Sequence, residues 1–143
     1  MILIDTHAWI WWTSESVKLS ENAAKAIHRT DRIGVSIISC REVAMLVAKQ
    51  RIGLNMDVQD WIDMALEFPK IQLIPIDPKS AVLSSRLPGK FHGDPADQLI
   101  VATCLNLGLP LISKSKFILS PTIDKILVNS PSSKVAVSSV KPE

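Results

Sequence analysis

The strongest constraint on the fold is the regular alternation of strand and helix signals along the chain. Four short apolar runs lack the polar alternation of a half-exposed strand, at residues 1–4, 33–38, 71–76 and 109–113. Such runs are typical of strands buried on both faces. Helical patterns lie between them. Because parallel strands need crossover helices that cover both faces, this order predicts a three-layer α/β/α sandwich around a mostly parallel sheet.

Capping residues set the expected helix boundaries. The helices should start after side chains that can accept a backbone N–H, namely Ser20, Ser39, Asp57, Asp77 and Asp94. The letters SCRE at residues 39–42 form a capping box, so we expect a helix over residues 43–52 that stops at Gly53. The longest helix should cover residues 96–107 and end at Gly108.

Length and composition are those of one globular domain. The 143 residues are 47% apolar, which is enough for a hydrophobic core. We expect a domain over residues 1–129, with a weak fifth strand at 126–128, and a flexible tail rich in Ser, Pro and Lys over residues 130–143. The longest apolar run has six residues, against the ~20 of a membrane span. No cysteine spacing suggests a disulfide framework, so we expect a cytoplasmic protein without membrane contact.

Four acidic residues should meet at one edge of the predicted sheet. Asp5 ends the first strand, Glu42 lies near the start of the helix after the second strand, and Asp94 and Asp97 open the helix before the fourth strand. In a parallel α/β sheet, the carboxyl ends of the strands and the N-termini of the crossover helices share an edge, and ligands bind there.

Carboxylates gathered in this way repel one another. Two of them ~6 Å apart at an effective dielectric of ~20 repel by roughly 3 kcal/mol, so a cluster either takes up protons or binds a cation. Hard oxygen ligands on an open edge suit Mg²⁺ or Mn²⁺. Such an ion can activate water and offset charge that develops on a phosphodiester. The cluster therefore suggests metal-assisted phosphodiester hydrolysis.

Each acid also has a structural interpretation. Glu42 fits the last position of the capping box, Asp94 is an N-cap before a proline, and Asp97 suits the positive end of a helix dipole. Asp5 has no evident cap to make. The placement of all four at one edge is therefore more informative than any one of them.

The motifs around these acids resemble PIN domains of the VapC toxin type. They read IDTHAW at residues 4–9, SIISCREVA at 36–44, HGDPADQLIVAT at 92–103 and LGLPLI at 107–112. Three separate acidic motifs occur in the family's order, and the resemblance covers about residues 1–128. It implies a PIN-like α/β/α sandwich and an endoribonuclease that depends on Mg²⁺ or Mn²⁺.

The resemblance also assigns roles and partners. It implies that Asp5 and Asp97 are the principal metal ligands, that Glu42 completes the metal site, and that Asp94 is an accessory acid of the catalytic cluster. It further implies a homodimer that cuts RNA as the toxin of a VapBC-type pair and is neutralised by a VapB-like antitoxin. Side chains expected to contact the substrate are Ser39, Lys114, Ser115 and Lys116.

Two positions depart from the family pattern. An acidic residue commonly follows the fourth strand, where this chain has Ser115, and a basic residue often follows the second Asp of the DPxD motif, where this chain has Gln98. Loss of one carboxylate lowers the charge of the site and should weaken a second metal. A PIN fold that binds RNA or an antitoxin but cuts slowly or not at all therefore stays open as an alternative.

A phosphoacceptor receiver domain is a second alternative. Asp5, Asp77 and Lys114 at strand ends resemble its active site superficially. However, Asp77 precedes a proline as a good helix cap, and the acidic pair expected beside Asp5 is missing. Nothing in that assignment explains the DPAD motif at residues 94–97.

Overall fold

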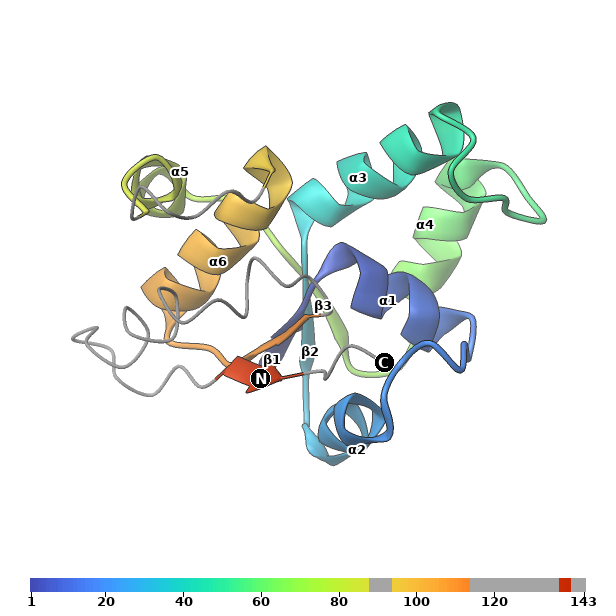
Figure 1. Cartoon of the computed structure of the whole chain (residues 1–143), viewed down its shortest axis with the longest axis horizontal. Helices are drawn as coiled ribbons and strands as arrows, with labels where there is room; N and C mark the ends of the chain where they lie inside the picture. The colour runs from blue at the N-terminus through green and yellow to red at the C-terminus, as the bar shows by residue number, and fades with distance from the viewer. Residues whose placement is uncertain (88–93, 114–136, 140–143) are drawn as a thin grey trace.

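A single parallel sheet forms the centre of the protein (Figure 1). The computed structural model describes residues 1–87, 94–113 and 137–139. Within them, the strands are β1 (Ile2–Ile4), β2 (Ile33–Ser36), β3 (Ile71–Ile74), β4 (Leu111–Ser113) and β5 (Val137–Ser139). Their order across the sheet is β3-β2-β1-β4-β5, and every neighbouring pair is parallel. The predicted fold class is confirmed.

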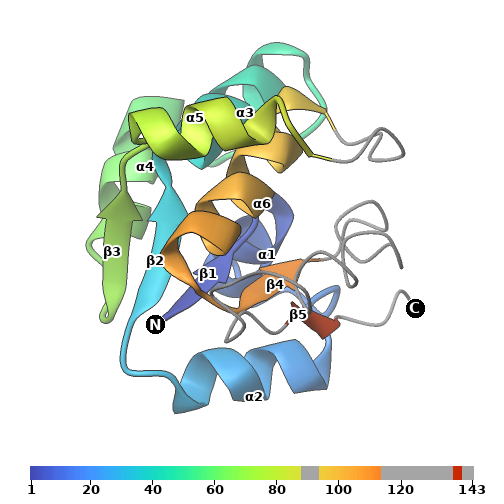
Figure 2. The same cartoon turned by 90° about the vertical axis from the view of Figure 1, so that its left-hand side faces the viewer.

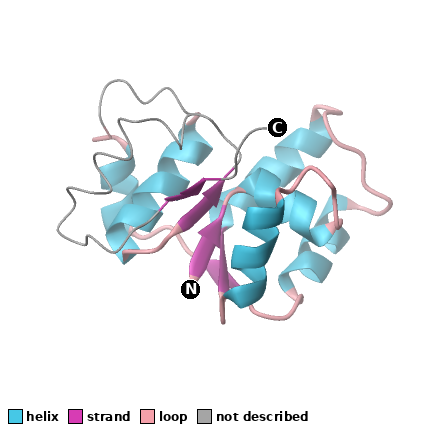
Figure 3. Cartoon of the chain, turned by 60° about the horizontal axis from the view of Figure 1, so that its bottom comes forward, coloured by secondary structure: helices cyan, strands magenta, loops and turns pink. Residues whose placement is uncertain are grey.

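Helices cover both faces of this sheet, which makes the molecule a three-layer sandwich (Figures 1 and 2). Those in the described residues are α1 (Thr6–Thr13), α2 (Glu21–Arg29), α3 (Ile37–Ala48), α4 (Val58–Leu66), α5 (Pro78–Ser84) and α6 (Pro95–Leu107). Helices α5 and α6 lie on one face, and α1, α3 and α4 lie on the other. In Figure 3 the strands run between these two groups of helices.

Each face of the sheet has its own hydrophobic core. Successive strand residues point to opposite faces, so Ile4 joins the core beneath α1–α4, whereas Leu3 joins the core beneath α5 and α6. Trp9 of α1 is fully buried in the first core and contacts Trp61 of α4, with ring centroids 5.1 Å apart. Both cores lie next to β1, which is central in the sheet and has no exposed face.

Gly34 allows β2 to sit close beside β1. It pairs with Leu3, and a Cβ atom at this position would lie 2.9 Å from Leu3 Cδ1 and 3.2 Å from Ile74 Cγ1. Because Cβ atoms do not approach other atoms so closely, any larger residue would force the side chains of two strands apart. The second core is therefore packed against the glycine backbone.

Two helices differ from the sequence expectation. Helix α1 was not anticipated, because the apolar residues of THAWIWWT are spread around the helix and show no amphipathic period, although His7 is exposed. Helix α3 begins at Ile37 and ends at Ala48, so the strand expected at 33–38 is two residues shorter. The helix expected over 43–52 is present, but it begins six residues earlier and ends four residues earlier. Its N-cap is Ser36, whose Oγ accepts the Ile38 N–H at 3.2 Å.

The remaining helix starts agree with the caps identified from the sequence. Ser20, Asp57, Asp77 and Asp94 each accept a backbone N–H from the first turn of their helix. Helix α6 ends at Gly108, which has a left-handed φ of 66°. The strand expected at residues 126–128 lies outside the described residues. Strand β5 falls within residues 130–143, the segment expected to be a flexible tail. No helix in the described part of the chain is long and apolar enough to cross a membrane.

Candidate active site at the acidic sheet edge

Asp5 is held in place by two hydrogen bonds at the end of β1. Its side chain is 2% exposed. Oδ1 accepts the Ala8 N–H at 2.8 Å, and Oδ2 accepts a hydrogen bond from Ser113 Oγ at 2.6 Å. Asp5 is thus the N-cap of α1, which corrects the expectation that it has no cap to make. The fold itself therefore orients this buried carboxylate.

Ser113 reaches Asp5 because β1 and β4 are neighbours. Ile4 pairs with Ile112, so the next residue of each strand lies at the same edge of the sheet. Ser113 is fully buried. Sequence reasoning assigned no role to Ser113, although it is a hydroxyl at the carboxyl end of a buried strand.

Thr6 and Ser39 connect α1 to α3 beside Asp5. Thr6 Oγ1 donates a hydrogen bond to Ser39 Oγ at 2.9 Å, and both side chains are buried. Ser39 is 0% exposed and lies inside α3, so Ser36 and not Ser39 caps this helix. In the structure Ser39 joins the two helices, and a substrate contact by this residue stays a prediction.

The first turn of α6 supplies two more acids. Asp94 is exposed and caps the helix, because its Oδ1 accepts the Asp97 N–H at 2.8 Å. Asp97 is partly buried, and its pKa is raised to about 7. Burial is the largest cause of this rise, followed by the negative charges of Asp94, Asp5 and Glu42. All four carboxylates thus influence one another at a single edge of the sheet.

Glu42 is the fourth member of this cluster. It lies in the second turn of α3, because the helix begins at Ile37, so the capping-box interpretation of Glu42 was wrong. Burial and the charge of Asp94 raise the pKa of Glu42, while the basic side chains of His7, Arg41 and Lys49 lower it. Glu42 therefore lies between the acidic edge and a group of positive charges.

The donor set fits a divalent cation held by few protein ligands. The neighbouring carboxylates repel the negative charge of Asp97 and so raise its pKa. A bound cation would offset this repulsion. Across residues 1–87, 94–113 and 137–139, however, no three His, Cys, Asp or Glu side chains gather closely enough to enclose an ion. This open arrangement suits Mg²⁺, which is commonly bound through one or two carboxylates together with water and phosphate oxygens.

Four further residues were selected from the sequence. Lys114, Ser115 and Lys116 are outside the described residues. Asp77 caps α5 and accepts hydrogen bonds from Ser80 N at 2.7 Å and Asn106 Nδ2 at 2.9 Å. These bonds lower the pKa of Asp77. Asp77 thus joins α5 to α6, which gives it a structural role and removes the support for a receiver-type phosphoacceptor.

A parallel α/β/α sandwich with buried and half-buried carboxylates at the carboxyl edge of its strands defines the class of PIN-like proteins. A model of the PIN domain matches residues 2–116, and the chain belongs to this family. It is a VapC-type member: over 115 residues it is 36% identical to Ribonuclease VapC22 of Mycobacterium tuberculosis. That alignment covers 80% of this chain and 87% of the relative.

Solved structures share the fold at lower identity. A toxin–antitoxin complex from Klebsiella pneumoniae matches with a TM-score of 0.58 and 22% identity, covering 92% of this chain and 94% of the other. VapBC2 from Rickettsia felis, bound to a promoter DNA fragment, matches with a TM-score of 0.61 and 18% identity over 86% and 96%. FitAcB from Neisseria gonorrhoeae matches with a TM-score of 0.58 and 19% identity over 96% of both chains. These similarities support the three-layer fold.

Proposed function

We propose that this protein is an endoribonuclease that hydrolyses RNA phosphodiesters with a divalent cation, Mg²⁺ or Mn²⁺. The observation that carries the proposal is the cluster of Asp5, Glu42, Asp94 and Asp97, in which each of the other three raises the Asp97 pKa. The relative that is 36% identical is named a ribonuclease, and divalent-metal dependence is general among PIN-domain ribonucleases.

The residues of the cluster have different proposed roles. Asp5 and Asp97 would be the principal metal ligands, and Glu42 would complete the site. The hydrogen bonds from Ser113 Oγ and the Ala8 N–H set the orientation of Asp5. Exposed Asp94 is proposed as an accessory acid that keeps the first turn of α6 in place. When bound, a divalent cation would activate water and stabilise the charge that develops on the scissile phosphate. The protein residues would hold that ion and orient the RNA strand beside it.

The biological role proposed is that of a toxin controlled by a VapB-like antitoxin. One solved structure with this fold is described as a toxin–antitoxin complex, and another, VapBC2, is bound to a DNA fragment from its promoter. By the same resemblance, the protein should form a homodimer and act in the cytoplasm. The nuclease domain is proposed to span residues 1–129, and β5 from the segment that follows adds an edge strand beside β4.

A cleavage assay with a matched pair of variants tests the proposed activity. Wild-type protein, Asp97→Asn and Asp31→Asn would be incubated with structured RNA across a Mn²⁺ or Mg²⁺ titration. Asp31 is an exposed acid just before β2, at the opposite edge of the sheet, so its variant controls for the loss of one charge. We expect metal-dependent cleavage by the wild type and Asp31→Asn, and its loss in Asp97→Asn.

The same experiment addresses the catalytically weakened alternative, which the departure at position 115 favours. RNA binding without metal-dependent cleavage by the wild type would support a binding protein and overturn the nuclease proposal. Equal cleavage by all three proteins would remove Asp97 from the site.

A further inference from the structure

A cavity of 480 Å³ opens beside the acidic edge and extends along α3. Its acidic side is formed by Glu42 and Asp94. The other polar side chains that line it are all basic, namely His7, Arg41, Lys49 and Arg51. Met45, Leu46 and Ile52 provide apolar surface between these groups. The cavity thus joins the proposed catalytic acids to a group of cations.

The spacing of residues along α3 explains this division of charge. Residues 42, 45, 46 and 49 follow the i, i+3, i+4, i+7 pattern, so they lie on one face of the helix. Glu42 and Lys49 are seven residues apart, which corresponds to a rise of ~10.5 Å. Along one helix face, the cavity therefore changes from acidic through apolar to basic.

The turn after α3 brings a second cation to the same end of the cavity. Gln50 has a left-handed φ of 58°, the Gln50 N–H donates to Val47 O at 3.0 Å, and the Arg51 N–H donates to Leu46 O at 2.9 Å. This is a Schellman motif, which normally has glycine at the left-handed position. It reverses the chain so that Arg51 and Ile52 line the cavity together with Lys49.

The cations of this cavity are available for a ligand. Arg41, Lys49 and Arg51 are exposed, and no hydrogen bond or ion pair of their side chains is formed with the described residues. Only Glu42 and Asp94 offer negative charge among the lining residues. A polyanion that enters with one phosphate at the acidic edge would therefore meet uncompensated positive charge further along α3.

We infer that this cavity is the subsite that seats the RNA strand beside the scissile phosphate, with Lys49 and Arg51 binding its backbone phosphates. The inference rests on the proposed nuclease function and adds the position of the substrate. The distance of ~10.5 Å along α3 spans about three nucleotides at the ~3.4 Å rise of a stacked strand. The apolar surface of Met45, Leu46 and Ile52 would contact a ribose or a base without reading its sequence.

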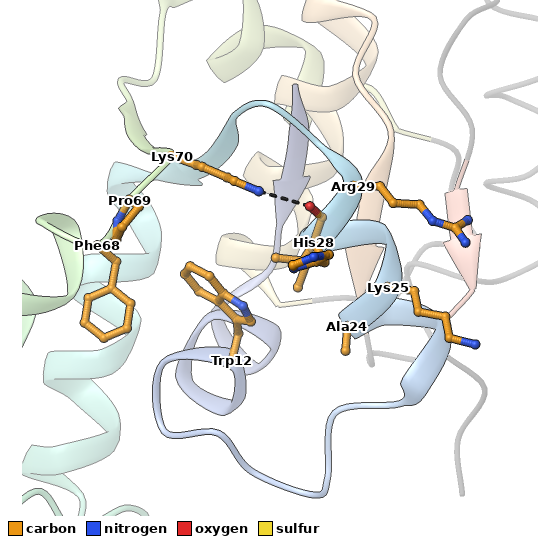
Figure 4. A pocket seen from close by; sticks show the side chains of 9 residues that line it. Trp12, Ala24, Lys25, His28, Arg29, Phe68, Pro69 and Lys70 are labelled. Atoms are coloured by element: carbon orange, nitrogen blue, oxygen red, sulfur yellow. Dashed lines mark hydrogen bonds between the residues drawn. The ribbon is translucent and has the colours of Figure 1, made fainter.

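A second pocket provides a matched control. It has a volume of 850 Å³, contains Trp12 and Phe68, and also presents cations, including Lys25 and Arg29 (Figure 4). Lys70 in this pocket donates a hydrogen bond to His28 O at 3.0 Å. The pocket lies where α2 ends and β3 begins, at the edge of the sheet opposite Asp5. Its cations should not contact a strand that is bound at the acidic edge.

The test compares two double variants of the full chain that each remove two positive charges. Binding of a fluorescein-labelled single-stranded RNA of mixed sequence would be measured by anisotropy in EDTA over a range of salt concentrations. We expect Lys49→Gln/Arg51→Gln to raise the Kd about tenfold at 0.1 M salt and to lower the slope of log Kd against log salt by about 1.4, or ~0.7 for each phosphate lost. Lys25→Gln/Arg29→Gln should leave the slope unchanged.

Cleavage of the same RNA in Mn²⁺ separates the subsite from the chemistry. Lys49→Gln/Arg51→Gln should raise KM about tenfold and change kcat much less, since neither side chain is a proposed metal ligand and Lys49 acts on Glu42 only through its charge. If the two double variants weaken binding equally, or if Lys49→Gln/Arg51→Gln binds like the wild type, the subsite is refuted. If the two double variants differ in RNA binding as expected but the wild type cuts no RNA, the nuclease function is refuted. The strand-binding cavity would then still be supported.

Discussion

Ser113 Oγ donates a hydrogen bond of 2.6 Å to Asp5 Oδ2, although the two residues are 108 positions apart in the sequence. Both side chains are buried at the carboxyl ends of β1 and β4. Ser113 thus holds one carboxylate oxygen of Asp5, and the Ala8 N–H holds the other. The acid that would bind the metal is oriented by two different parts of the fold.

Ser113→Ala should therefore affect both stability and activity. Removal of a donor from a buried charged acceptor costs about 1–3 kcal/mol, and a misoriented Asp5 should slow RNA cleavage. Denaturant unfolding and single-turnover cleavage would measure the two effects. Ser85→Ala, which removes an exposed hydroxyl bonded only to its own helix, should stay within about 0.5 kcal/mol of the wild type. A Ser113→Ala protein as stable as this control would contradict the role assigned to the hydrogen bond.

Asp97→Asn should separate chemistry from folding. Asp94 caps α6, so the substitution leaves the cap intact, and it removes one charge from a crowded acidic cluster. We expect the variant at pH 8 to melt at the same temperature as the metal-free wild type or at a higher one. It should lose cleavage and the rise in Tm caused by Mn²⁺ in the wild type. Thermal melts with and without metal measure this, and a variant that unfolds without metal would favour a purely structural Asp97.

The metal-free wild type should lose stability as the pH rises towards neutrality. The pKa of Asp97 is about 7 in the folded protein, against 3.8 for its ordinary value. Between these values the folded state binds more protons than the unfolded state, so the free energy of unfolding falls as pH increases. The stabilisation from the proton that folded Asp97 retains is fully present below pH ~4 and is lost above pH ~7. Melts from pH 5 to 8 should show this fall, with a smaller fall in Asp97→Asn.

Ser115→Asp should strengthen the site if the resemblance to VapC-type PIN domains holds at this position. Residue 115 lies outside the described residues, so the prediction rests on the sequence. A carboxylate is a better ligand for a hard cation than a hydroxyl, and we expect tighter Mn²⁺ binding and about tenfold faster cleavage, or ~1.4 kcal/mol of barrier. Single-turnover rates across a Mn²⁺ titration measure it. Unchanged rates and metal dependence would place residue 115 outside the site.

The sequence predicted those parts of the fold that depend on local signals. Asp57, Asp77 and Asp94 were identified as helix caps because each begins an amphipathic or proline-started segment, and each forms that cap. Helix α1 was missed because its apolar residues are spread around the helix and give it no amphipathic period, although His7 is exposed. The start of α3 was misplaced because Ser36 and Ser39 both resemble N-caps, and only packing decides between them.

The candidate site was partly predictable for a related reason. Parallel topology alone brings Asp5, Glu42 and Asp97 to one edge, so their proximity followed from the order of strands and helices. The hydrogen bonds from Thr6 to Ser39 and from Ser113 to Asp5 join residues 33 and 108 positions apart. No local pattern encodes such contacts. The basic half of the cavity was likewise missed, because Lys49 and Arg51 meet only through the left-handed turn at Gln50.

The central position of β1 has a consequence for synthesis on the ribosome. Strand β1 lies between β2 and β4 in the sheet, and β4 is translated about a hundred residues after β1. Until Ser113 has emerged, Asp5 lacks its buried donor, and the acids of α6 are in place only shortly before that. A nascent chain thus carries an incomplete acidic edge until β4 has followed β1 out of the ribosome. A nuclease built in this order would remain inactive beside the ribosome's own RNA until β4 has paired with β1.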